Sequence, residues 1–125
     1  MALDDEIERW ILPDDSGSPA LGRALVEGAL EDVASIDDIV LATSELVTNA
    51  VEHGEGPVEL TLIRSRGTVR IEAASAFAGR EPAPRRAGHE DSGGRGLALV
   101  ETLATRWGWE RQADVLRVWA EFDPV

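Results

Sequence analysis

Apolar residues recur at two different spacings along the chain, and the change from one to the other divides it into helices and strands. Spacings of three and four residues predict three helices, over residues 19–33, 35–54 and 97–107. A short apolar run over residues 9–12 that ends at a proline predicts an edge strand, and four further strands are predicted over residues 58–63, 69–73, 109–111 and 116–122. The order of these elements indicates a single α+β domain over residues 1–125, a two-layer sandwich with helices on one face of a mostly antiparallel sheet.

Residues that commonly begin or end helices flank the first two predicted helices. Ser18 is suited to the N-cap of the first helix, with Pro19 at its first helical position. Ser35 followed by Asp38 resembles a capping box at the start of the second, and Gly54 is placed to cap its end.

The second predicted helix carries three polar residues in a row. Glu45, Asn49 and His53 are four residues apart, so they project from one face while apolar residues occupy the opposite side. The row is either part of a site or an ordinary solvated helix face, because a short motif of this kind often matches by chance. His53 is interpreted as structural, since a histidine at a helix end is usually satisfied by a backbone carbonyl or water.

A glycine-rich segment leads into the last predicted helix. Gly93, Gly94 and Gly96 surround Arg95 and precede the apolar run that begins at Leu97. Glycines let the backbone approach a ligand closely, and the free N–H groups at a helix start are suited to hold phosphate. Alone, the segment is equally explained as a flexible hinge. Combined with the polar helix face, it indicates phosphate-binding amides from one element and a metal ligand and carboxylate from another.

A polar loop, residues 76–92, lies between the predicted hairpin and the last helix. It contains prolines, glycines and scattered charges. A loop of this length inside a compact domain is commonly a lid or a binding loop.

The composition limits the classes of function. The formal net charge is −12 and all twelve basic residues are arginine, which argues against nucleic-acid binding because phosphate contacts need clustered cations. An acidic surface repels anions, so a nucleotide would need a bound cation and backbone donors, while a basic protein partner is an equally natural interpretation. The chain has no cysteines, which excludes disulfides and zinc–thiolate sites.

The chain shows no sign of export or membrane insertion. Its first residues are acidic where a signal peptide is basic, and no apolar run approaches the ~20 residues of a membrane helix. We therefore expect a cytoplasmic protein without a membrane segment.

Two motifs resemble the GHKL superfamily of ATPases, which contains histidine kinase and HSP90-like domains. They are LATSELVTNAVEH at residues 41–53 and GGRGLALVE at residues 93–101, followed by RWG at residues 106–108 and VWAEF at residues 118–122. Within the superfamily, the chain is most similar to the small single-domain anti-sigma factor serine kinases of bacteria, over residues 10–123. The resemblance implies the Bergerat fold, an α/β sandwich that binds ATP.

The resemblance also implies a role for each matching position. Asn49 would be the ligand of Mg²⁺, which prefers hard oxygen donors. Glu45 would be the general base that activates a protein serine hydroxyl, or a water, for attack on the γ-phosphate of ATP. Residues 76–92 would be the ATP lid. The implied phosphate-binding residues are Gly93, Gly94, Arg95, Gly96 and Leu97.

One position departs from the family pattern. Relatives carry an aspartate that accepts a hydrogen bond from the adenine amino group, and Ser75 stands in its place here. Losing a charge-assisted contact in a buried pocket costs about 1.5–3 kcal/mol, roughly ten- to a hundred-fold in affinity. Glu72 is the nearest acidic residue, but it is expected on the other side of the sheet.

Two functions are therefore open. The first is an ATP-dependent serine/threonine kinase that sequesters a sigma factor and phosphorylates a serine of a STAS-domain anti-sigma antagonist. The second is a partner-binding module on the same fold in which ATP binding is weak or lost. Members of the family are often dimers, so the resemblance also allows a homodimer. Most of the four tryptophans are expected in the core; they are Trp10, Trp107, Trp109 and Trp119.

Overall fold

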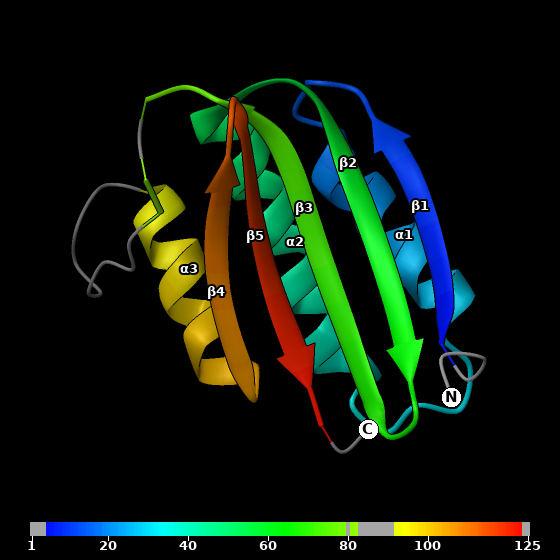
Figure 1. Ribbon diagram of the computed structural model, residues 1–125. Coiled ribbons are helices and arrows are strands. Elements are labelled where there is room, and N and C mark those ends of the chain that lie inside the picture. Colours follow the sequence, from blue (N-terminus) through cyan, green and yellow to red (C-terminus); the bar gives the residue numbers. More distant parts are fainter. Residues whose placement is uncertain (1–4, 80, 83–91, 124–125) are drawn as a thin grey trace.

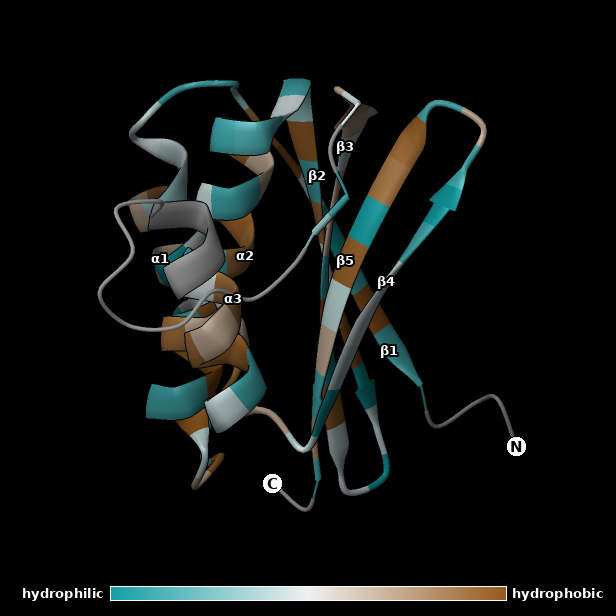
Figure 2. Cartoon of the chain, turned by 90° about the vertical axis from the view of Figure 1, so that its left-hand side faces the viewer, coloured by the Kyte–Doolittle hydropathy of each residue, from teal (hydrophilic) through white to brown (hydrophobic). Residues whose placement is uncertain are grey.

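A five-stranded antiparallel sheet and three helices make up the protein in the computed structural model, which describes residues 5–79, 81–82 and 92–123. The elements in chain order are β1 (Glu6–Leu12), α1 (Ser18–Ala29), α2 (Ile36–His53), β2 (Gly54–Ser65), β3 (Thr68–Phe77), α3 (Ser92–Leu103), β4 (Arg106–Gln112) and β5 (Val115–Phe122). The strand order is β1-β2-β3-β5-β4, with every neighbouring pair antiparallel (Figure 1). All three helices cover one face of this sheet (Figure 2), which confirms the predicted two-layer α+β sandwich.

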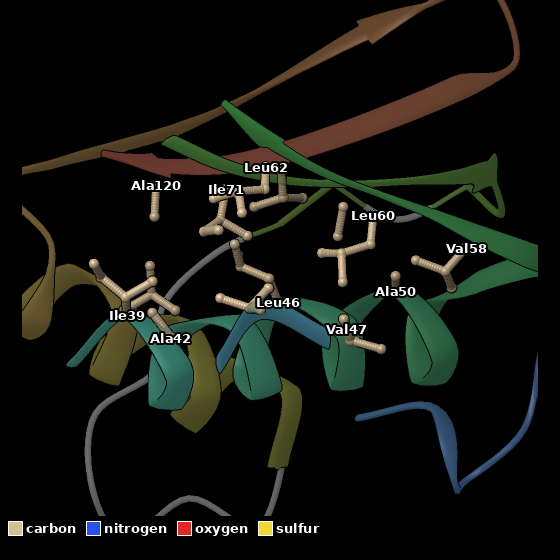
Figure 3. Close-up of a cluster of buried hydrophobic side chains, with 14 of the residues drawn as sticks. Ile39, Ala42, Leu46, Val47, Ala50, Val58, Leu60, Leu62, Ile71 and Ala120 are labelled. Carbon is tan, nitrogen blue, oxygen red and sulfur yellow. The ribbon is translucent and has the colours of Figure 1, made fainter. Parts of the chain in front are cut away.

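The core lies between α2 and the sheet. Side chains from α2 meet those of β2, β3 and β5, and at most 5% of each is exposed (Figure 3). Alternate residues of the strands point into this layer because successive side chains of a strand face opposite sides. The core residues labelled in Figure 3 are Ile39, Ala42, Leu46, Val47, Ala50, Val58, Leu60, Leu62, Ile71 and Ala120.

The other face of the sheet carries charges instead of helices. On β3, β4 and β5, arginines and acidic residues alternate across the strands and form what we call the outer-face ion network. Arg70 bonds Glu72 and Glu121, each at 2.7 Å, and Arg106 bonds Glu121 at 2.8 Å. The full network is Arg70, Glu72, Arg106, Glu110, Arg117, Glu121 and Asp123.

Three of the four tryptophans pack against the core, as expected: Trp10, Trp107 and Trp109. Trp119 instead lies on the outer face, where the guanidinium of Arg70 is 4.2 Å from the centre of its ring. A Cβ at Gly108 would lie 2.8 Å from Cζ2 of Trp119, so the ring rests directly on the neighbouring strand. Successive side chains of β5 face opposite sides of the sheet. Val118 and Ala120 are buried on the side of the helices, so Trp119 between them faces the other side.

Several predicted element ends were wrong. α1 is capped by Gly17, while Ser18 is fully buried in its first turn with its hydroxyl donating to the carbonyl of Pro13; the helix ends at Ala29 instead of residue 33. The capping box at Ser35 does not form, since its side chain makes no cap hydrogen bond. Gly54 does cap α2, but with an extended backbone.

The C-terminal elements also begin earlier than expected. α3 starts at Ser92, and β4 starts at Arg106, which takes residues 106 and 107 out of the predicted helix. None of the helices within the described ranges is both long and apolar enough to span a bilayer.

Candidate functional site

Helix α2 is the element along which the predicted site residues gather. It runs without interruption over Ile36–His53, so Glu45, Asn49 and His53 follow one another at successive turns. Asn49 is buried, whereas Glu45 and His53 are partly exposed. Nε2 of His53 lies 4.0 Å from a carboxylate oxygen of Glu52, at the end of the helix.

The side chain of Asn49 has the properties expected of a ligand-binding group. The residue is 4% exposed, yet none of the hydrogen bonds among the described residues involves its carboxamide. No fully enclosed side-chain nitrogen or oxygen in those residues lacks a partner, so the carboxamide must reach a space open to solvent. The carboxamide is therefore free of hydrogen bonds to the described residues and accessible to a small ligand or ion from solvent. Its oxygen is a hard donor and fits Mg²⁺.

Glu45 lies between α1 and α3. Burial raises the pKa of its carboxyl above the ordinary 4.5, the negative charge of Glu52 raises it further, and the positive charge of Arg23 lowers it. On the α3 side, Oε2 of Glu45 would lie 2.6 Å from a Cβ placed on Gly96. The carboxylate is thus held close to the first turns of α3.

The glycine-rich segment is helical. Gly93, Gly94, Arg95 and Gly96 all lie in the first turns of α3, not in a loop before it, because the helix begins at Ser92. The backbone at Gly96 has no positive φ, whereas Gly56, Gly67 and Gly79 do. The side chain of Leu97 is 1% exposed and belongs to the hydrophobic core, which leaves only its backbone for a ligand. The side chain of Arg95 lies outside the part of the structure that is described.

Ser75 lies where β3 passes the end of α2. It is 6% exposed, and a Cβ on Gly54 would collide with its hydroxyl oxygen and come within 2.7 Å of the carbonyl oxygen of Ala50. The hydroxyl enters none of the hydrogen bonds within the described ranges, and since no enclosed polar atom there is unpartnered, it also reaches solvent. Ser75 and Asn49 are therefore brought to the same end of α2.

The neighbouring strand is bulged beside Ser75. The register of β2 on β3 shifts between Glu55 and Glu59, so three residues of β2 lie opposite Ser75 alone. Gly56, within this bulge, has a φ of +71° and donates its N–H to Asp14 at 3.1 Å. Bulges often occur beside sites because they interrupt the pairing locally.

Glu72 cannot replace the missing aspartate. Its carboxylate belongs to the outer-face ion network, at 2.7 Å from Arg70 and 3.3 Å from Arg117. The strand alternation places it on the side of the sheet opposite to Ser75, as expected.

Sequence patterns did not reveal two polar neighbours of Glu45. Arg23, on α1, donates a hydrogen bond of 2.8 Å to the hydroxyl of Ser44, which precedes Glu45 on α2. This contact joins two helices that are separated in sequence, so no spacing within either helix predicts it. Arg23 is the single basic residue of α1, and this was the available hint.

The predicted lid starts from a fixed anchor. Ala76 and Phe77, its first expected residues, belong to β3, and Ser92 belongs to α3. The N–H of Phe77 donates to the carbonyl of Asp114 at 2.7 Å, and the guanidinium of Arg111 lies 4.0 Å from the centre of the Phe77 ring. Residues 80 and 83–91 of the predicted lid lie outside the described residues.

Comparisons with known proteins agree with this architecture. Residues 20–121 match a family model described as the histidine kinase-like ATPase domain. A crystal structure of the RsbU and RsbW domains of Rv1364c from Mycobacterium tuberculosis is similar with a TM-score of 0.71 and 21% sequence identity; the match covers 94% of this chain and 32% of that chain. At this identity the likeness concerns the fold alone. No curated protein matches the chain.

Proposed function

The chain belongs to the histidine kinase-like ATPase (GHKL) family, and we propose that it binds Mg·ATP along α2 and transfers the γ-phosphate to a serine hydroxyl of a protein partner. The observation that carries this proposal is the state of Asn49, a buried carboxamide without a hydrogen bond among the described residues, one turn from a desolvated carboxylate on the same helix. A carboxamide that opens to solvent and has no hydrogen bond to the described residues is available to a ligand.

Each residue has a chemical role in this proposal. Asn49 would hold Mg²⁺, which supplies neutralisation of the phosphate charge. The backbone at the start of α3 would receive phosphate oxygens. The hydroxyl oxygen of the partner's serine forms a bond to the γ-phosphorus, and the bond between that phosphorus and the ADP oxygen breaks. Glu45 accepts the proton that the serine hydroxyl loses. Its raised pKa makes it a better proton acceptor than an ordinary glutamate.

The partners follow from the same family type. We assign the phosphate acceptor to the STAS-domain anti-sigma antagonists and the sequestered partner to the sigma factors, with the similarity to a structure containing an RsbW domain as support. A net charge of −12 favours a basic surface on the sequestered partner. The cytoplasm, where ATP and sigma factors occur, is the proposed location.

Calorimetric titration of Mg·ATP into the wild type and an Asn49→Ala variant tests this function. We expect micromolar binding that falls by more than about tenfold in Asn49→Ala, since one lost ligand interaction of about 1.4 kcal/mol or more has that effect. Asn49→Asp is the matched control, because it keeps an oxygen ligand at the same place. Binding to wild type that is unaffected by Asn49→Ala would contradict the assigned site.

A second function, a partner-binding module without phosphotransfer, is favoured by Ser75. Its short hydroxyl replaces the charged adenine acceptor and packs tightly on Gly54. If this function holds, wild type does not bind Mg·ATP while Ser75→Asp gains binding. Absence of binding in wild type, Asn49→Ala and Ser75→Asp would contradict the kinase proposal altogether.

A further inference from the structure

The backbone conformation at Gly96 is one that any residue can adopt, so it does not require a glycine. It is buried in the first turns of α3, and its φ lies outside the positive range that favours glycine. Glycine is a poor helix former compared with alanine. A glycine at such a position therefore needs a reason that lies in its surroundings.

Among the described residues, Glu45 has the side chain nearest to a Cβ placed on Gly96. A Cβ built there would lie 2.6 Å from Oε2 of Glu45, 3.6 Å from its Cδ and 3.7 Å from its Cβ. The three nearest atoms all belong to Glu45, so the glutamate side chain, from its Cβ to its carboxylate, passes beside Gly96. Real Cβ atoms do not approach an oxygen to 2.6 Å, and any larger residue would displace the carboxylate.

We propose that Gly96 is a positioning residue for Glu45: its missing side chain creates the place in which the carboxylate of the general base is held. This inference rests on the proposed phosphotransfer function and adds a second role for Gly96 besides the backbone contact with phosphate. The end of a glutamate side chain is flexible, so a methyl group at position 96 moves the carboxylate without disrupting the packing of α2 on α3.

The variant Gly96→Ala separates positioning from phosphate binding. We expect its affinity for Mg·ATP, measured by calorimetry, to stay within about threefold of wild type. Its rate of phosphate release from Mg·ATP, with water as acceptor, falls about 100-fold, because a misplacement of about 1 Å has that effect on a reacting group. Loss of affinity with an unchanged rate for the bound nucleotide would assign Gly96 to phosphate binding and overturn the proposal, and so would no effect on either.

Glu45→Asp supplies the rescue test, since a shorter carboxylate leaves room for the methyl group. Glu45→Asp alone lowers the rate. We expect Gly96→Ala to lower it no further in the Glu45→Asp background, whereas an independent role of Gly96 would make the two losses multiply. Gly28→Ala is the matched control, because a Cβ at this glycine of α1 meets nothing within 4 Å.

A measurement without nucleotide tests the positioning role independently of the proposed function. It follows the ¹³C NMR resonance of the Glu45 side-chain carboxyl. If wild type neither binds nor hydrolyses ATP, the phosphotransfer proposal fails, but the resonance still reports the contact. We expect it to move in Gly96→Ala toward the position of an exposed glutamate. An unchanged resonance would overturn the positioning role.

Discussion

At the scale of residues, Glu45 experiences opposing influences that decide when it is ionised. Burial has the largest effect and raises the pKa of its carboxyl, Glu52 adds to this, and Arg23 opposes both. Because the folded pKa is above that of the unfolded chain, ionised Glu45 destabilises the folded state. The destabilisation is present at neutral pH and disappears below the ordinary value of 4.5, where the carboxyl is protonated in both states.

Glu45→Gln should therefore be more stable than wild type at pH 7 and inactive in phosphotransfer. The amide keeps the shape of the side chain but carries no charge to desolvate. Thermal melting at pH 7 and pH 4 checks this, with the gain at pH 7 shrinking at the lower pH. A melting temperature below that of wild type at pH 7 would contradict the assigned burial of the charge.

Arg23→Gln should shift the pH dependence of activity. Removing its positive charge leaves burial and Glu52 unopposed, so the pKa of Glu45 rises and the base is ionised only at higher pH. The acidic limb of the rate of ATP hydrolysis then moves to higher pH. Arg64→Gln is the control, since that arginine pairs with Glu6 of β1 at 3.9 Å and is not among the charges that shift the pKa of Glu45. Identical pH profiles for wild type and Arg23→Gln would contradict this role.

At the scale of elements, α1 contains two glycines with opposite surroundings. A Cβ on Gly28 would meet nothing within 4 Å, while one on Gly22 would lie 3.2 Å from Val47 and 3.4 Å from Leu60. Gly22 thus lets α1 pack closely on α2 and β2, and Gly28 only weakens the helix.

Replacing these glycines by alanine should have different effects on stability. Gly28→Ala should raise the free energy of unfolding by about 0.5 kcal/mol, the usual difference between glycine and alanine in a helix. Gly22→Ala gains the same helix propensity but forces its neighbours apart, so it should be less stable than Gly28→Ala. Urea denaturation measures both, and equal gains would contradict the close packing of α1.

The elements were largely predictable because each depends on its own residues. Apolar spacing indicated every helix and strand in the correct order. Their ends were less predictable, because they depend on contacts: the hydroxyl of Ser18 bonds the carbonyl of Pro13 instead of capping α1.

For the site, too, features within one element could be predicted from the sequence, and contacts between elements could not. Glu45 and Asn49 are on one helix, so their spacing alone predicts a shared face. The contacts of Glu45 with Gly96 and of Ser75 with Gly54 join different elements, and the chain spacing contains no information about them. Gly54 illustrates this: it was expected as a cap, and its lack of a side chain also makes room for Ser75.

At the scale of the whole molecule, the outer-face ion network links three strands. Glu121 is at its centre, and hydrogen bonds from Arg106 and then Arg70 lower the pKa of its carboxyl. A lowered carboxyl pKa stabilises the folded state above the ordinary value of 4.5, and this stabilisation is lost as the pH falls through the lower folded value.

Glu121→Gln should be less stable than wild type at pH 7, and the difference should close in acid. The amide cannot accept the two charge-assisted hydrogen bonds. Chemical denaturation at pH 7 and below pH 4 measures the difference, with 1 M NaCl as a further condition that should reduce it. A difference that persists in acid would mean that packing, not charge, is responsible.

The edge position of β1 has a consequence for how the molecule opens. The β2–β3 and β4–β5 pairs are local hairpins joined by short turns, whereas β1 pairs only with β2, after α1 and α2 have intervened. Closing that loop costs more chain entropy than closing a hairpin. We expect β1 and α1 to detach together as the least stable cooperative unit, so that their amides exchange hydrogen at lower urea than those of β3 and β5. Since Arg23 belongs to α1, each such opening would also remove the positive charge beside Glu45.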